Sequence, residues 1–191
     1  VANASWWNDD WNFRKQITLD TTAAGAGFNA GVKDAPVLLR LHIGNFGYFA
    51  DTKPDGADLR FVAGDDKTPL PFYIEYYDPT VEMAYIWVKV PELVSNTSAS
   101  IYMYYGNAEA TGGSDPAAIQ DVSQILSYSF AEEPFRDLTE YANNPAQATA
   151  TLSPGAVIGA GVAFAGAESI QVPSSAVLRY LPDFGLTFST W

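Results

Sequence analysis

His42 is the sole histidine among the 191 residues, and the chain has no cysteine. A serine-type catalytic triad would use this histidine as its base, but no Gly-x-Ser-x-Gly elbow accompanies it. Zinc sites draw their ligands mainly from cysteine and histidine, so this composition argues against zinc. We therefore predict a protein without catalytic residues, in which His42 is a partly exposed strand residue.

Carboxylates are the second group that could do chemistry. Asp51, Asp55 and Asp58 fall in one turn region, where oxygen ligands could gather around calcium. Aspartate is also a common turn residue, and we favour this structural interpretation here and at residues 9–10 and 65–66. A glycosidase needs two carboxyls facing each other across a cleft, and nothing in the sequence selects such a pair. We predict no metal and no cofactor.

The sharpest candidate is a face of aromatic side chains on a predicted hairpin of two strands. In the expected register Tyr77 faces Tyr85, and Glu75 faces Trp87. Flat rings with polar edges suit the apolar faces of sugar rings, and they also suit protein interfaces. The alternative is that these rings pack under a loop, a second sheet or a neighbouring subunit, since large aromatics are usually partly buried. The predicted ligand-binding face comprises Tyr73, Glu75, Tyr77, Tyr85, Trp87, Tyr102 and Tyr104.

The elements that must position these residues are β-strands. Apolar and polar residues alternate with a period of two through the first part of the chain, which is typical of half-buried strands. Gly, Pro and Asp separate these runs and favour turns. Short strands joined by turns predict an all-β fold, with an antiparallel β-sandwich of jelly-roll type. We expect the strands around residues 17–19, 37–43, 59–61, 72–77, 84–90 and 101–105.

The composition changes after residue 107, where a stretch of small and polar residues indicates an interdomain linker. We predict a first β-sandwich over residues 1–115, a linker over 116–124 and an incomplete second sandwich over 125–191. Its last strand has no turn after it, so we expect this domain to continue beyond Trp191. The second domain should contain strands at 125–130, 161–164, 169–172 and 186–191.

The charge balance narrows the choice of partners. The formal net charge is −12 at pH 7, so nucleic acid and anionic lipid headgroups are poor partners. No apolar run approaches the roughly 20 residues that a membrane span needs, so we expect membrane contact only through segments outside this chain. A first residue of Val1 rather than methionine fits either a processed N-terminus or a sequence trimmed at that end.

Six ordered sequence blocks in the first domain carry a family resemblance. Together they resemble a bacterial and archaeal extracytoplasmic domain of unknown function, which occurs beside laminin-G-like modules in large members of the MotA/TolQ/ExbB proton-channel family. The resemblance covers nearly the whole first domain. The blocks are residues 6–15, 36–42, 54–61, 69–75, 86–91 and 101–107.

The second part of the chain resembles the beginning of a concanavalin-like (laminin-G-like) jelly roll. One departure is that residues 140–144 replace the Gly-rich turn often found after the position of Asp137, which weakens the case for a calcium or sugar loop there. The matching pieces are residues 126–130, Asp137 with Asn143 and Asn144, and residues 161–164, 170–173 and 186–191.

These resemblances imply a protein exported to the periplasm. The implied function is a non-catalytic structural or ligand-recognition module of a MotA/TolQ/ExbB-type proton-channel membrane protein, anchored to the inner membrane by downstream segments. The alternative, motivated by the aromatic face, is a secreted or cell-surface carbohydrate-binding or adhesive protein. A hydrolase with its chemistry elsewhere in the gene is a third hypothesis. The expected partners are a glycan, peptidoglycan or protein ligand, and further copies of the chain in a homo-oligomer.

Overall fold

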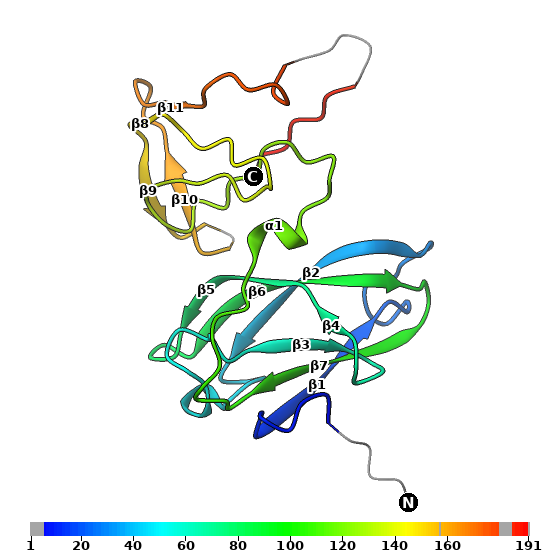
Figure 1. The fold of residues 1–191 in the computed structure, drawn as a ribbon. Helices are drawn as coiled ribbons and strands as arrows, with labels where there is room; N and C mark the ends of the chain where they lie inside the picture. The colour runs from blue at the N-terminus through cyan, green and yellow to red at the C-terminus, as the bar shows by residue number, and fades with distance from the viewer. Residues whose placement is uncertain (1–5, 157, 180–184, 191) are drawn as a thin grey trace, which may run out of the picture. The chain divides into compact units, whose positions relative to one another are not determined.

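The computed structural model of the chain describes residues 6–156, 158–179 and 185–190. It divides into two compact units, Val1–Asp121 and Val122–Trp191, and this division falls inside the predicted linker 116–124. The regular elements are nearly all antiparallel strands, long in unit 1 and short in unit 2, which confirms the predicted all-β fold (Figure 1).

Unit 1 consists of two antiparallel sheets that face each other (Figure 1). The four-stranded sheet has, in spatial order, β1 (Phe13–Asp20), β7 (Ser98–Tyr105), β3 (Arg60–Ala63) and β4 (Pro69–Leu70). The three-stranded sheet has, in spatial order, β2 (Val32–His42), β6 (Met83–Leu93) and β5 (Phe72–Asp78). Two short helical turns complete the unit, η1 (Phe49–Asp51) and α1 (Pro116–Ile119).

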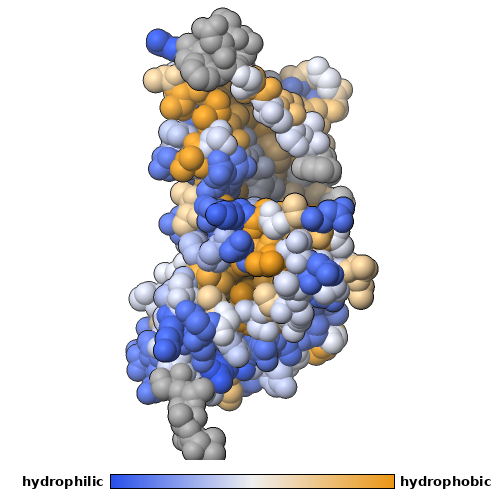
Figure 2. All heavy atoms as spheres, turned by 90° about the vertical axis from the view of Figure 1, so that its right-hand side faces the viewer, coloured by the Kyte–Doolittle hydropathy of each residue, from blue (hydrophilic) through white to orange (hydrophobic). Residues whose placement is uncertain are grey.

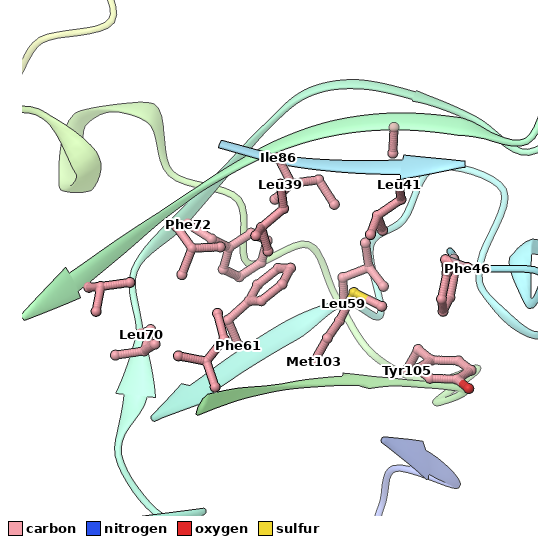
Figure 3. Close-up of a cluster of buried hydrophobic side chains, with 14 of the residues drawn as sticks. Leu39, Leu41, Phe46, Leu59, Phe61, Leu70, Phe72, Ile86, Met103 and Tyr105 are labelled. Carbon is pink, nitrogen blue, oxygen red and sulfur yellow. The ribbon is translucent and has the colours of Figure 1, made fainter. Parts of the chain in front are cut away.

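The space between the two sheets is filled by one hydrophobic core. Leu39 and Leu41 of β2 and Ile86 of β6 point from one sheet toward Phe61 and Met103 of the other, as Figure 3 shows. Ile86, Phe61 and Met103 are almost completely buried. Burial of a side chain of this size contributes about 1.5–3 kcal/mol, so this core fixes the relative position of the two sheets.

The sequence pattern locates the strands of unit 1 well. Each of the six predicted strands overlaps an observed one. The one observed strand of unit 1 that the sequence did not predict is β4, because two residues are too few for any alternation to be visible. The order of the strands across each sheet was not predictable from alternation, since the pattern contains no information about which strand pairs with which.

Unit 2 contains two small antiparallel pairs in its described part. Strand β8 (Gln147–Ala148) pairs with β11 (Ile170–Gln171), and β9 (Thr151–Pro154) pairs with β10 (Ala160–Ala163). The strand predicted at 161–164 is therefore observed one residue earlier, as β10, and the strand predicted at 169–172 exists in shorter form, as β11, whereas β8 and β9 were not predicted.

Two predicted strands of unit 2 are wrong. Residues 125–130 form no strand, because this segment pairs with a turn: Ser127 N donates to Asp137 Oδ1 and Ser127 O accepts from Leu138 N. Residues 186–190 form no strand either, and Leu186 and Phe188 are largely exposed there. Trp191, the end of that predicted strand, lies outside the described residues.

Candidate functional site

The outer face of the three-stranded sheet carries most of the predicted aromatic residues. Along β6, Ala84, Ile86 and Val88 are buried in the core, whereas Tyr85 and Trp87 alternate with them and lie on the outer face, half-buried. This is the expected consequence of a period-two strand with one face on the core. The central strand of the sheet therefore presents two aromatic rings outward.

A β-bulge in β5 changes the register that the sequence suggested. Tyr73 pairs with Trp87 and Tyr76 with Tyr85, and the irregularity between them falls at Glu75. The predicted pairs Tyr77–Tyr85 and Glu75–Trp87 are therefore wrong. Trp87 pairs two residues earlier in β5 than predicted, which keeps the same facing. After the bulge, which inserts one unpaired residue, Tyr85 pairs one residue earlier than predicted, which inverts the facing.

The bulge exchanges the positions of Tyr76 and Tyr77. Tyr76 lies on the outer face with its ring centroid 5.9 Å from that of Tyr85. Tyr77 instead packs against the core, where its ring centroid lies 5.7 Å from that of Phe49 and its hydroxyl hydrogen-bonds the hydroxyl of Thr52. Burial raises the pKa of Tyr77. Tyr77 therefore does not share the outer face with Trp87.

Glu75 is held at the bulge by Trp87. The indole Nε1 of Trp87 donates a 2.5 Å hydrogen bond to Glu75 Oε2. Burial raises the pKa of Glu75, and the hydrogen bond from Trp87 opposes that shift. The glutamate and the indole thus form one polar and aromatic unit on the outer face of the sheet.

Strand β2 extends this surface on the other side of β6. Leu38 pairs with Trp87, and Arg40 pairs with Tyr85 and is exposed. Rings bordered by a guanidinium and a carboxylate can stack on an apolar surface and also hydrogen-bond hydroxyl groups. We call this surface the aromatic face; it consists of Leu38, Arg40, Tyr73, Glu75, Tyr76, Tyr85 and Trp87.

The chain itself covers one end of the three-stranded sheet. Asp115 N donates a 2.8 Å hydrogen bond to Phe72 O, and Ser114 Oγ accepts from Ile74 N. Helix α1 follows, with Asp115 capping its first turn and Ile119 buried. Lys89 Nζ donates to Gln120 O at 2.9 Å. Residues 114–120 thus bond to the end of the three-stranded sheet that contains Lys89, while Tyr76 and Arg40 are exposed at the opposite end of that sheet.

Tyr102 and Tyr104 belong to a different surface. They lie on β7 in the four-stranded sheet, and Tyr104 is completely buried. The rings of Trp6 and Trp7 meet Tyr104 at centroid distances of 5.8 and 5.6 Å. The prediction that these tyrosines join the face of Trp87 is wrong, because strand β7 pairs with β1 and β3 and not with the hairpin.

A polar network fixes the residues around Tyr104. Its hydroxyl donates a 2.6 Å hydrogen bond to Asp66 Oδ1 and accepts one from Trp7 N at 2.9 Å. Asp66 also pairs with Arg14, whose guanidinium lies 4.9 Å from the ring centroid of Tyr102. Burial raises the pKa of Tyr104, and its hydrogen bond to Asp66 adds to that shift. These contacts anchor the segment before β1.

The predicted carboxylate region is structural. Asp58 is completely buried, and its two oxygens accept from Lys53 N at 2.8 Å and from Gly106 N at 2.7 Å. Asp55 accepts from Ala57 N within its own turn. Among the described residues no group of three or more His, Asp or Glu side chains is arranged to hold a metal ion. His42 lies at the end of β2, where its Nδ1 accepts from Gly44 N at 3.0 Å.

Asp137 organises the turn of unit 2. Its carboxylate accepts hydrogen bonds from Ser127 N, Asn143 N and both the backbone nitrogen and the hydroxyl of Thr139. Asn144 Oδ1 in turn accepts from Asp137 N. With Asp137 buried and bonded to four donors, this loop uses its carboxylate to order its own backbone. Burial next to Asp137 raises the pKa of Tyr128 to about 12.

The fold and the site together define an antiparallel β-sandwich protein with an aromatic outer face. The model of the domain of unknown function DUF2341 matches residues 55–150, half of the chain, and the chain belongs to this family. The match extends from the turn before β3 across the boundary between the units to the end of the β8 region. No curated protein and no solved structure matches the chain. No helix in the described residues is long and apolar enough to cross a membrane.

Proposed function

We propose that unit 1 is a non-catalytic carbohydrate-recognition module, and that its aromatic face contacts the sugar. The observation that supports this proposal is the position of Trp87 on the central strand, with Tyr73 beside it on β5 and Tyr85 two residues before it. A sheet face is rigid, so the rings are held in place before a ligand arrives and lose little conformational entropy on binding.

The polar groups of the aromatic face suit a hydroxylated ligand. Arg40 is exposed beside Tyr85, and Glu75 accepts from the Trp87 indole while its carboxylate keeps further acceptor capacity. Rings offer the apolar faces of a sugar a flat contact, and the guanidinium and carboxylate offer donors and acceptors to its hydroxyls. We therefore expect a neutral glycan or a peptidoglycan strand as ligand.

The experiment is a retention assay on a glycan panel and on peptidoglycan sacculi, with the chain of residues 1–191. Tyr85→Ala removes a half-buried ring from the aromatic face, and we expect retention to fall at least tenfold. Tyr48→Ala is the matched control, because Tyr48 is 49% exposed and lies outside that face. Equal retention of wild type and Tyr85→Ala would refute the proposal, as would the absence of retention on every glycan of the panel.

The cellular setting is proposed from the sequence resemblance. In this proposal the chain is the periplasmic part of a MotA/TolQ/ExbB-type proton-channel protein, and unit 2 is the start of a laminin-G-like jelly roll. The alternative is a secreted or cell-surface adhesive protein with the same sugar-binding face. Fractionation of cells that express the complete gene product separates the two settings. A proton-channel protein requires inner-membrane association, with the chain protected from external protease. An adhesive protein requires recovery outside the cell or at its surface.

A further inference from the structure

A cavity of about 450 Å³ opens at the end of unit 1 where β1 ends and β2 begins. Figure 2 views this side of the molecule and shows hydrophobic residues in a hollow among hydrophilic ones. The cavity is separate from the aromatic face, because it opens beside the edge of the sandwich and none of the aromatic-face residues lines it. Its principal lining residues are Leu19, Ala26, Phe28, Val32, Val37 and Leu93.

The floor of the cavity is the hydrophobic core itself. Ala35 and Leu93 belong to the buried cluster between the sheets, and Leu19, Phe28 and Val37 pack against that cluster. Water in such a space finds few polar partners and is easily displaced by an apolar group. The rim is more polar, because Asp20, Lys33 and Asp34 also line the opening.

The backbone beside the cavity argues against an added β-strand as the occupant. Both β1 and β2 are edge strands, which are ordinarily open to strand addition. Lys89 N donates to Pro71 O and therefore points away from β2. Pro36 pairs with Lys89. Because Lys89 makes no backbone bond to β2, the nitrogen of Pro36 points to the free edge of the sheet. Proline has no N–H to offer there. Asp34 has a φ of +49°, which departs from extended backbone.

We infer that this cavity binds a small aliphatic molecule, of the size of a short acyl or alkyl chain and with a neutral or cationic end. Its volume lies within the range of small-molecule sites, roughly 300–1,000 Å³, and its lining is largely apolar. The rim carries two carboxylates and one ammonium, and the chain has a net charge of −12. This charge disfavours an anionic end group.

The test is an NMR titration of the methyl groups of Leu19, Val37 and Leu93 with octan-1-ol. We expect saturable shifts at these methyls, and weaker binding of octanoate than of octanol. Ala26→Leu places a larger side chain in the cavity from the β1–β2 loop and should weaken octanol binding at least tenfold. Ala24→Leu, in the same loop but outside the lining, should leave binding unchanged.

A second variant keeps the test independent of how Ala26→Leu folds. Val32 is 43% exposed at the start of β2, and Val32→Ser should weaken octanol binding severalfold by removing apolar lining. Absence of saturable shifts in the wild-type chain would overturn the inference. So would octanol affinity that stays equal in the wild type, Val32→Ser and a folded Ala26→Leu, or octanoate binding that is tighter than octanol binding.

Discussion

Trp87 Nε1 donates a 2.5 Å hydrogen bond to Glu75 Oε2 across the bulge in β5. This bond joins the residue that interrupts the regular strand pairing to the central ring of the aromatic face. It explains why a carboxylate is tolerated in a half-buried position, because the indole N–H satisfies one of its oxygens. Burial of Glu75 raises its pKa, while the hydrogen bond from Trp87 opposes that shift, so its protonation should depend on folding.

Glu75 should make unit 1 less stable as the pH rises. Burial raises its pKa above the ordinary value of 4.5, so the folded state holds its proton over a range where the unfolded state has released it. The stabilisation that Glu75 contributes to the folded state is fully present below pH 4.5 and is lost as the pH rises through the raised pKa. Glu75→Gln should lose this dependence.

The measurement is urea unfolding of wild type and Glu75→Gln at several pH values between 4 and 8. Asp65 and Asp78 have lowered pKa values, so they make stability rise with pH in both proteins. Subtracting one curve of unfolding free energy against pH from the other therefore isolates the contribution of Glu75. A difference in unfolding free energy that is constant with pH would show that Glu75 titrates alike in the folded and unfolded chains.

Tyr104→Phe should destabilise unit 1 by about 1–3 kcal/mol, because the loss of the hydroxyl leaves Asp66 Oδ1 and the Trp7 amide without their partner. Chemical denaturation measures the loss. Tyr85→Phe is the control, since Tyr85 lies on the aromatic face and its hydroxyl has no hydrogen bond within the described part of the chain; it should change stability by less than about 0.5 kcal/mol. Equal effects of the two substitutions would contradict this account.

Gly106→Ala should cost more than Gly112→Ala. Gly106 follows β7 with a φ of +84°, and an added Cβ would lie 2.5 Å from Phe13 Cδ2. Gly112 has open space at the same position. We expect a loss of at least about 1 kcal/mol for Gly106→Ala from backbone strain and crowding, and no loss for Gly112→Ala. Thermal unfolding of both variants decides, and similar melting temperatures would refute the prediction.

Asp137→Asn should loosen unit 2 without affecting unit 1. The amide nitrogen that replaces one oxygen faces N–H and O–H donors, so hydrogen bonds from Ser127, Thr139 and Asn143 are lost or weakened. Amide hydrogen exchange should become faster throughout the 125–144 region and stay unchanged in β6. Glu140→Gln, at an exposed neighbouring position, provides the control. Protection that survives in Asp137→Asn would show that the turn is held by other contacts.

The sequence by itself determined the fold class and most strands of unit 1. The alternation of apolar and polar residues along β2 and β6 follows directly from a strand with one face on a core, so it is visible without any partner. The aromatic character of the face around Trp87 was visible for the same reason. The turn role of Asp55 also followed from local backbone chemistry, whereas the bond from Gly106 N to the buried Asp58 is a tertiary contact.

Only the tertiary structure decided which aromatic residues lie together. The bulge at Glu75 places Tyr76 outward and Tyr77 inward, and local alternation before and after it looks equally regular. Strand pairing separates Tyr104 from Trp87, since β7 and β6 lie in different sheets. In unit 2 the 125–130 segment has a strand-like pattern, but its backbone groups pair with the turn at Asp137. Register and pairing are long-range properties that depend on residues far apart in the chain, and a local pattern does not contain them.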